Sequence, residues 1–146
     1  MIGLLQRVTQ ASVTVDDKTI ASIQTGLLVL IGVEKGDTEK QADRLLERLL
    51  GYRVFPDGDA RMNLGLKDIN GDLLLVPQFT LPADTRKGMR PGFSPAAAPE
   101  TGKFLFEYLV TVARREHPRV ETGIFGAHML VSLTNNGPVT FIIETP

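Results

Sequence analysis

The stretch Leu27-Leu28-Val29-Leu30-Ile31-Gly32-Val33 constrains the fold most, because it is apolar almost throughout. A strand that is covered on both faces has this pattern, whereas a strand with one face in solvent alternates. Asp72-Leu73-Leu74-Leu75-Val76 is a second run of the same kind, and Pro77 is expected to end or bulge it. Two such runs predict a sheet whose centre is buried between layers.

Two helices are predicted where the apolar spacing changes to that of an α-helix. Thr38 and Gln41 have the spacing of a capping box and indicate a helix from about 38 to 52. Its apolar face consists of Ala42, Leu45, Leu46, Leu49 and Leu50. Pro99 can occupy the first turn of a second helix, which His117-Pro118 would end. The expected buried face of this helix consists of Phe104, Leu105, Tyr108, Leu109 and Val112.

The remaining apolar segments are typical of strands. They comprise residues 2–8, 13–15, 19–21, 129–133 and 139–143, with a polar turn at Asp16-Asp17-Lys18. Strands, helix, strand, helix and strands in this order predict an α/β fold. We expect a single domain over residues 1–146, with a mixed, mostly antiparallel and barrel-like sheet in layers with two main helices.

Composition limits the classes of function. The chain has 146 residues, 42% of them hydrophobic, which is enough for one compact core. The 16 basic and 17 acidic side chains leave a net charge of -1, so any nucleic-acid site must be local. The absence of cysteine excludes disulfides and thiolate catalysis. Without a signal-peptide pattern or a membrane-spanning run, we expect a soluble, cytoplasmic protein.

The motifs of common hydrolases and nucleotide-binding enzymes are missing. No Gly-x-Ser-x-Gly, His-Glu-x-x-His, Gly-x-x-x-x-Gly-Lys or Gly-x-Gly-x-x-Gly pattern occurs. His117 lies at a helix end and His128 opens a strand, and a structural role is expected for both. Because histidines and carboxylates are not clustered, we expect no metal and no cofactor. Catalysis would then rely on backbone groups, hydroxyls and the substrate.

Gln78-Phe79-Thr80 directly follows the second buried run and Pro77. Backbone amides past a strand end can stabilise the oxyanion that forms when water attacks an activated ester, such as an aminoacyl ester of ribose. Thr80 could orient the water, and Gln78 could bond the substrate or brace the loop. Thr80 is a poor covalent nucleophile because no His or Lys is evidently placed to take its proton. Taken alone, the segment is an ordinary strand end.

Asn135-Asn136-Gly137-Pro138-Val139-Thr140 separates the last two apolar runs. Asn-Gly in this position is typical of a short hairpin turn. The Gly-Pro bond supports an alternative, because proline cannot donate a ladder hydrogen bond and can leave bare backbone between strands.

The segment from Pro82 to Ala98 is expected to be irregular, and loops of this length are usually functional or disordered. Arg86, Lys87 and Arg90 outnumber Asp84 within it, which leaves a local surplus of two positive charges on a balanced chain. RNA phosphates are natural partners for such a loop.

Several segments together resemble the D-aminoacyl-tRNA deacylases, of the D-tyrosyl-tRNA deacylase type, over essentially the full chain. They are Gln6-Arg7-Val8, Ala11-Ser12-Val13, Pro77-Gln78-Phe79-Thr80-Leu81, Arg90-Pro91-Gly92-Phe93-Ser94, Gly123-Ile124-Phe125-Gly126-Ala127 and Asn136-Gly137-Pro138-Val139-Thr140. The resemblance implies hydrolysis of the ester bond of D-aminoacyl-tRNA, which releases the D-amino acid and the tRNA as proofreading in translation.

The resemblance also implies which residues form the site. Its catalytic segment is Gln78, Phe79 and Thr80, and its Gly137-Pro138 bond is cis and enters the pocket of the partner in a homodimer. Arg7 would hold this cis loop. Pro77 and Met129 would lie with it at the substrate, and Arg86, Lys87 and Arg90 would contact the aminoacylated acceptor end of the tRNA.

A pocket that accepts many side chains but rejects one hand has to recognise the α-amino group and the Cα hydrogen. The carbonyls of Gly137 and Pro138 suit the amine, and their rigid atoms would clash with an L side chain. Glycine has no side chain to reject, so glycyl-tRNA, mischarged on tRNA-Ala, is a further expected substrate.

The chain departs from the family pattern at three positions. The family commonly has serine in place of Pro77 and aspartate in place of His128 and Asn136. Proline at this place also resembles a related animal deacylase that removes L-alanine from a threonine tRNA. An editing deacylase for L-alanyl or glycyl esters is therefore one alternative, and a non-catalytic module that binds RNA or an amino acid is another. Phe79 and Arg7 favour the D-specific branch.

Overall fold

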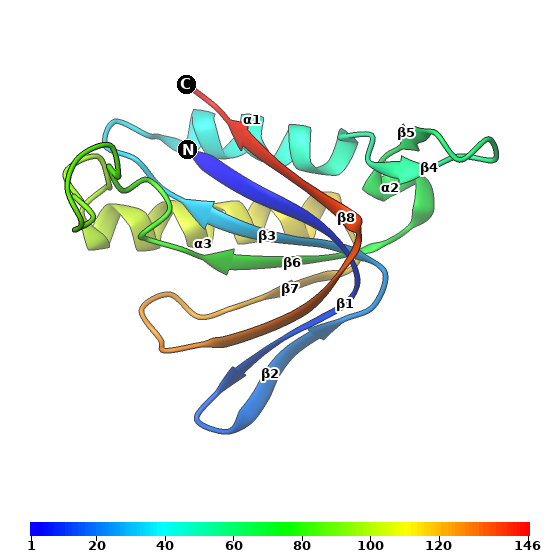
Figure 1. Ribbon diagram of the computed structural model, residues 1–146, viewed down its shortest axis with the longest axis horizontal. Helices are drawn as coiled ribbons and strands as arrows, with labels where there is room; N and C mark the ends of the chain where they lie inside the picture. Colours follow the sequence, from blue (N-terminus) through cyan, green and yellow to red (C-terminus); the bar gives the residue numbers. More distant parts are fainter.

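A computed structural model describes residues 1–146 as one curled mixed sheet with helices on one of its faces (Figure 1). The strands of the sheet are β1 (Ile2–Val15), β2 (Lys18–Ile23), β3 (Gly26–Gly32), β6 (Asp72–Pro77), β7 (Val120–Thr122) and β8 (Leu130–Glu144). The helices are α1 (Glu39–Gly51), α2 (Leu66–Ile69) and α3 (Pro99–Glu116), and β4 (Phe55–Pro56) pairs with β5 (Met62–Leu64) in a small separate hairpin.

The strand order is β2-β1-β3-β6-β7, and β8 pairs with β1. Only the β3–β6 and β6–β7 pairs are parallel, and the pairs that involve β1 are antiparallel. The predicted mixed, mostly antiparallel and barrel-like sheet is confirmed. β3, which is buried except at the half-buried Leu30, occupies its centre, as its apolar run indicated.

Two hydrophobic clusters fill the two sides of the sheet. The larger one joins α1 and α3 to β3 and β6, and includes the apolar face predicted for the first helix. The smaller one lies inside the curl of the sheet and contains residues of β1, β2, β3 and β6. The long β1 makes this possible, because it pairs with β3 through its first half and with β2 through its second.

The helix boundaries agree with the prediction, but the buried face of α3 does not. The Gln41 side chain accepts a hydrogen bond from the Thr38 N–H at 2.8 Å, which completes the predicted capping box of α1. In α3 the expectation for Phe104 was wrong, since this residue is 56% exposed and Phe106 is buried instead. Tyr108 and Val112, also expected to be buried, are only half-buried. The face that packs on the sheet contains Gly102, Leu105, Phe106, Leu109, Val110 and Ala113.

The last two apolar runs form one strand instead of two. Residues 130–135 and 140–144 of β8 both pair antiparallel with β1, so the Asn-Gly hairpin turn is excluded. The ladder shifts register between Gln6 and Val8 and again between Val8 and Gln10. The additional residues of β8 are accommodated there as a bulge, which contains Gly137 and Pro138.

The short elements between α1 and β6 were not predicted from the sequence. The β4–β5 hairpin closes around Asp57, whose carboxylate accepts hydrogen bonds from the backbone of Asp59 and Arg61 and from the Asn63 side chain. These hydrogen bonds lower the pKa of Asp57, with the Arg61 backbone contributing most.

None of the three helices combines the length and the apolar character that a membrane span requires.

Candidate active site

The end of β6 presents two backbone amides that have no partner in the chain. Pro77 is the last residue of β6, and the Gln78 N–H donates to the Ile31 carbonyl at 2.8 Å, which extends the ladder by one bond. Neither the Phe79 N–H nor the Thr80 N–H donates a hydrogen bond within the protein. Both residues are exposed, so these two adjacent amides are open to water or to an anionic oxygen of a ligand.

The side chains of Gln78 and Thr80 contact each other. Gln78 Nε2 donates to Thr80 Oγ1 at 2.6 Å, so the amide braces the hydroxyl. The hydroxyl proton of Thr80 then remains available for a second hydrogen bond, to water or to a ligand.

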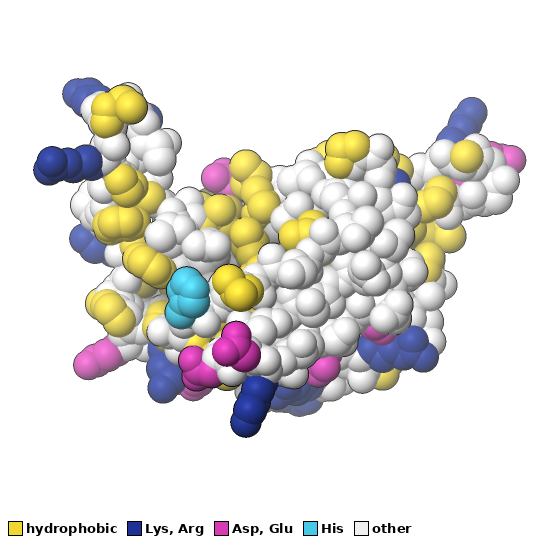
Figure 2. Space-filling model, turned by 60° about the horizontal axis from the view of Figure 1, so that its bottom comes forward, with side chains coloured by type: hydrophobic (Ala, Val, Ile, Leu, Met, Phe, Trp, Pro, Cys, Tyr) yellow, Lys and Arg dark blue, Asp and Glu magenta, His cyan; other side chains and the backbone are white.

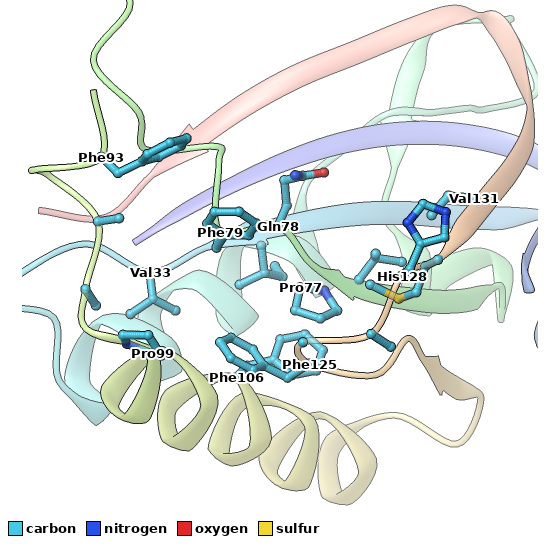
Figure 3. Close-up of a pocket in the computed structure, with 18 residues that line it drawn as sticks. Val33, Pro77, Gln78, Phe79, Phe93, Pro99, Phe106, Phe125, His128 and Val131 are labelled. Carbon is cyan, nitrogen blue, oxygen red and sulfur yellow. The ribbon is translucent and has the colours of Figure 1, made fainter. Parts of the chain in front are cut away.

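A cavity of about 630 Å³ opens beside these residues, between the end of β6, α3 and the segment that connects β7 to β8 (Figure 3). Among the predicted site residues, Pro77, Gln78, Phe79 and Met129 line it. The lining is mostly apolar, with Phe106 and Phe125 at the side of α3, and its single ionisable side chain is His128. The cavity therefore contains no carboxylate or lysine that could act as a base for Thr80.

Met129 and His128 reach the cavity from the β7–β8 connection. Met129 Sδ accepts a hydrogen bond from the Ile124 N–H at 3.4 Å, which fixes the thioether against the turn. A Cβ on Gly123 would lie 2.7 Å from this sulfur, so the Met129 side chain would have to move to make room for it. His117, by contrast, is buried at the end of α3, where Nε2 lies 2.6 Å from the Gly71 carbonyl oxygen, and this confirms its structural role.

Gly137 and Pro138 do not line the cavity of their own chain. They lie in the bulge of β8, at the opposite end of the sheet from the loop that follows β6 (Figure 1). The peptide bond between them is cis, and Gly137 has a φ of 138°, a conformation that favours glycine.

Two side chains hold this bulge. Arg7 donates from Nε to the Asn136 carbonyl at 2.9 Å and from Nη1 to the Val54 carbonyl at 2.7 Å, so it faces the bulge and not the solvent. Asn135 Oδ1 accepts from the Val139 N–H at 2.7 Å, across the bulge. The sequence did not single out Asn135, although its position beside Asn-Gly-Pro was the available signal.

The loop after β6 carries the predicted cationic residues outside the cavity. The backbones of Asp84 and Gly92 exchange two hydrogen bonds, at 2.7 and 2.9 Å, and close the loop at its base. Arg86 binds the Asp84 carboxylate through Nε and Nη2, both at 2.8 Å, which holds the pKa of Asp84 well below its usual range. This pairing leaves Lys87 and Arg90 as the unpaired cations of the loop. Figure 2 shows several Lys or Arg side chains that project from the left side of the molecule, where Figure 1 places this loop.

No group of three or more His, Cys, Asp or Glu side chains is arranged to hold a metal ion. The groups that the site offers are the two amides, a braced hydroxyl and an apolar cavity lined in part by His128. Such a set can stabilise negative charge on a carbonyl oxygen and orient water next to it.

The chain is similar to known proteins over its whole length. The family model of D-Tyr-tRNA(Tyr) deacylase matches residues 4–144. A D-aminoacyl-tRNA deacylase of Thioalkalivibrio sulfidiphilus is 62% identical over 100% of this chain and 98% of the relative. A D-aminoacyl-tRNA deacylase of Nitrosococcus oceani is 60% identical over 100% of this chain and 94% of the relative.

Two solved structures have the same architecture. A c-Myc DNA unwinding element binding protein superposes with a TM-score of 0.95 at 34% identity, over 100% of this chain and 99% of that chain. A probable eukaryotic D-amino acid tRNA deacylase superposes with a TM-score of 0.84, over 99% and 98% of the two chains. Its identity of 19% shows the fold alone.

Proposed function

Because the chain belongs to the D-aminoacyl-tRNA deacylase family, we propose that it hydrolyses the ester bond between a D-amino acid and the terminal ribose of a tRNA. The observation that carries the proposal is the pair of unpartnered amides of Phe79, which lines the apolar cavity, and of the adjacent Thr80. The substrate meets the translation machinery in the cytoplasm, where we expect the enzyme to act.

The proposed reaction is attack by water on the ester carbonyl. The Phe79 and Thr80 N–H groups hold the carbonyl oxygen as it becomes negative, and Thr80, braced by Gln78, orients the water. The neighbouring ribose hydroxyl of the substrate relays the proton, since the cavity offers no carboxylate or lysine. It takes up the proton that the water loses and passes its own proton to the ribose oxygen of the ester. The bond between that oxygen and the carbonyl carbon then breaks, which releases the amino acid and the tRNA.

A homodimer would complete the site. Gly137 and Pro138 lie away from the cavity of their own chain, so their backbone can reach a substrate only in the cavity of a second copy. The outer edge of β8 is unpaired, and the strand exposes apolar side chains at Leu130 (60%), Leu133 (36%), Phe141 (37%) and Ile142 (64%). A long edge strand with apolar residues is a surface that a partner covers.

The inserted carbonyls of Gly137 and Pro138 would then bind the α-amino group and exclude an L side chain. Arg7 binds the Asn136 carbonyl and Asn135 binds the Val139 N–H, so the residues on both sides of Gly137-Pro138 are held in place, which supports a rigid filter. Glycine passes such a filter, so glycyl-tRNA mischarged on tRNA-Ala belongs to the proposed substrates. Lys87 and Arg90 would contact phosphates of the acceptor end.

The proposal is tested by incubating the protein with matched D- and L-aminoacyl-tRNA and with glycyl-tRNA, and following the loss of ester. We expect rapid loss of the D and glycyl esters and a stable L ester. Preferential loss of L-alanyl ester would identify the enzyme as an editing deacylase for that substrate. Binding without any ester loss would identify a non-catalytic module.

Substitution of Thr80 by alanine is expected to slow single-turnover hydrolysis by about 10- to 100-fold without abolishing it. The reason is that the amide donors and the substrate hydroxyl remain in place. Thr111→Ala is the matched control, because the Thr111 hydroxyl only bonds the Glu107 carbonyl within α3. An acyl-enzyme ester on Thr80, detected by mass spectrometry, would contradict this mechanism.

Asp84→Asn is expected to lower KM for aminoacyl-tRNA several-fold at low salt and to leave kcat unchanged. The variant removes one negative charge, while its amide oxygen can still accept from Arg86, so the loop gains one net positive charge. The dependence of log KM on log salt should become steeper by about one unit. Asp59→Asn on the β4–β5 hairpin is the control, and an equal salt dependence in both variants would place the RNA elsewhere.

A further inference from the structure

The rings of Phe79 and Phe93 form an exposed aromatic pair at the rim of the cavity (Figure 3). Their centroids are 5.7 Å apart with an interplanar angle of 38°, and the two residues are 65% and 45% exposed. Two neighbouring aromatic side chains that remain this exposed mark a surface that contacts a ligand or a partner.

Both rings are attached to well-anchored backbone. Phe79 follows the last ladder bond of β6, which the Gln78 N–H makes with Ile31. Phe93 follows the Asp84–Gly92 closure, and its carbonyl accepts from the Ala96 N–H at 3.0 Å. The pair is therefore largely preorganised, and a ligand that packs on it loses little free energy in ordering the protein.

The position of the pair suggests the chemistry of its ligand. The rings face the cavity. The loop that carries Lys87 and Arg90 lies between Asp84 and Gly92, whose paired backbones directly precede Phe93. Figure 2 shows hydrophobic side chains between the projecting basic loop and the hollow of the molecule. An aromatic surface next to cations is how proteins bind single-stranded RNA, by base stacking and phosphate contacts.

We propose that Phe79 and Phe93 form a stacking platform for the base of the nucleotide that precedes the terminal adenosine of the substrate tRNA. The inference rests on the proposed function, because it describes the path of the same substrate. The cavity, at about 630 Å³, has the size of a small-ligand site and takes the terminal nucleoside with its amino acid. The two rings line the cavity at its rim, and Phe93 directly follows the loop that carries Lys87 and Arg90.

A second copy of the chain is the competing occupant of the platform. The apolar residues exposed on β8 do not include the two rings and offer a surface for a dimer interface without them. The cations beside the platform are complementary to RNA, whereas β8 contains no Lys or Arg. The charge of the surroundings therefore favours the nucleotide.

The test compares Phe93→Leu and Phe93→Tyr on D-aminoacyl-tRNA and on D-aminoacyl-adenosine, which lacks the preceding nucleotide. Phe93→Leu keeps an apolar side chain but removes the ring, and is expected to raise KM for the tRNA about tenfold with kcat unchanged. Phe93→Tyr should restore the wild-type KM. On D-aminoacyl-adenosine all three proteins should have the same KM and kcat.

Phe104→Leu is the matched control, because Phe104 is 56% exposed on α3 and does not line the cavity. Equal increases of KM on both substrates would overturn the proposal and place the ring against the terminal adenosine. An unchanged KM for the tRNA would also overturn it, and a change in oligomeric state measured by sedimentation would assign the platform to a second copy. If the wild-type protein hydrolyses neither D ester, the proposed function itself fails.

Discussion

Replacement of Gly137 by alanine is expected to reduce the hydrolysis of D-aminoacyl-tRNA by about 100-fold while the fold survives. Gly137 has a φ of 138°, which an L side chain rarely adopts, and a Cβ there would lie 2.8 Å from Val139 Cγ2 and 3.1 Å from Arg7 Nη2. The bulge has to shift to relieve the unfavourable backbone conformation and the two close contacts. Because the residue is exposed and outside both hydrophobic clusters, the cost to stability remains local.

The same substitution is expected to lower the preference for D over L esters. The carbonyls that would bind the α-amino group also reject the L side chain, so a shifted bulge loses affinity and selectivity together. Rates on matched D- and L-aminoacyl-tRNA measure the ratio, and a thermal melt checks folding. Gly58→Ala is the control, because a Cβ at Gly58 meets nothing within 4 Å. A well-folded variant with unchanged D over L selectivity would show that the bulge is only structural.

A mixing experiment tests whether the bulge acts in the partner's site. Gly137→Ala has an intact cavity, and a Gln78→Ala/Thr80→Ala double variant has an intact bulge. If the bulge acts across the interface, the mixed dimer contains one site with both wild-type parts, so coexpression should restore activity. If the coexpressed protein hydrolyses the ester only at the mean rate of the two separate variants, the bulge does not act in the cavity of the partner subunit.

Gly26→Ala is expected to have the largest effect on stability, a loss of about 3 kcal/mol or more in the free energy of unfolding. Gly26 begins β3 opposite Asp72 of β6, and the Asp72 N–H donates to the Thr25 carbonyl at 3.0 Å. A Cβ on Gly26 would lie 1.9 Å from the Asp72 carbonyl oxygen, so the two central strands would have to separate. The atoms that this Cβ would contact belong to the Asp72 backbone, so no flexible side chain can move away to make room.

Urea denaturation of the variant and the wild type measures this loss, and a drop of about 10 °C in Tm should accompany it. Gly51→Ala is the matched control at the end of α1, where a Cβ meets nothing within 4 Å. That variant should be slightly more stable, because alanine favours the helix more than glycine does. Equal stability of the two variants would mean that β3 and β6 do not approach as closely as described.

The sequence predicted the elements whose residues share a single environment. β3 and β6 are apolar on both faces, so their place at the centre of the sheet follows from composition alone. α1 was predicted with its cap, because the Thr38–Gln41 spacing and its apolar period are properties of one continuous segment. The absence of thiolate chemistry also follows from the sequence, since it contains no cysteine.

Errors arose where an apolar residue had two possible environments. Phe104 and Phe106 are two residues apart on α3, and the packing of α3 against α1 and the sheet decides which is buried. Asn136-Gly137-Pro138 has the composition of a turn, but both halves of β8 find the same partner strand, β1. Pairing with a strand more than a hundred residues away outweighed the local preference for a turn.

The sequence by itself therefore determined the fold class, the central strands and the kind of chemistry that is open to this protein. Tertiary structure alone decided that Arg7 binds the Val54 and Asn136 carbonyls, that the Phe79 and Thr80 amides stay unpartnered, and that the bulge lies outside its own cavity. The physical reason is that hydrophobic periodicity is local to a segment. The partners of backbone donors and acceptors come from remote segments, and only the folded chain brings them together.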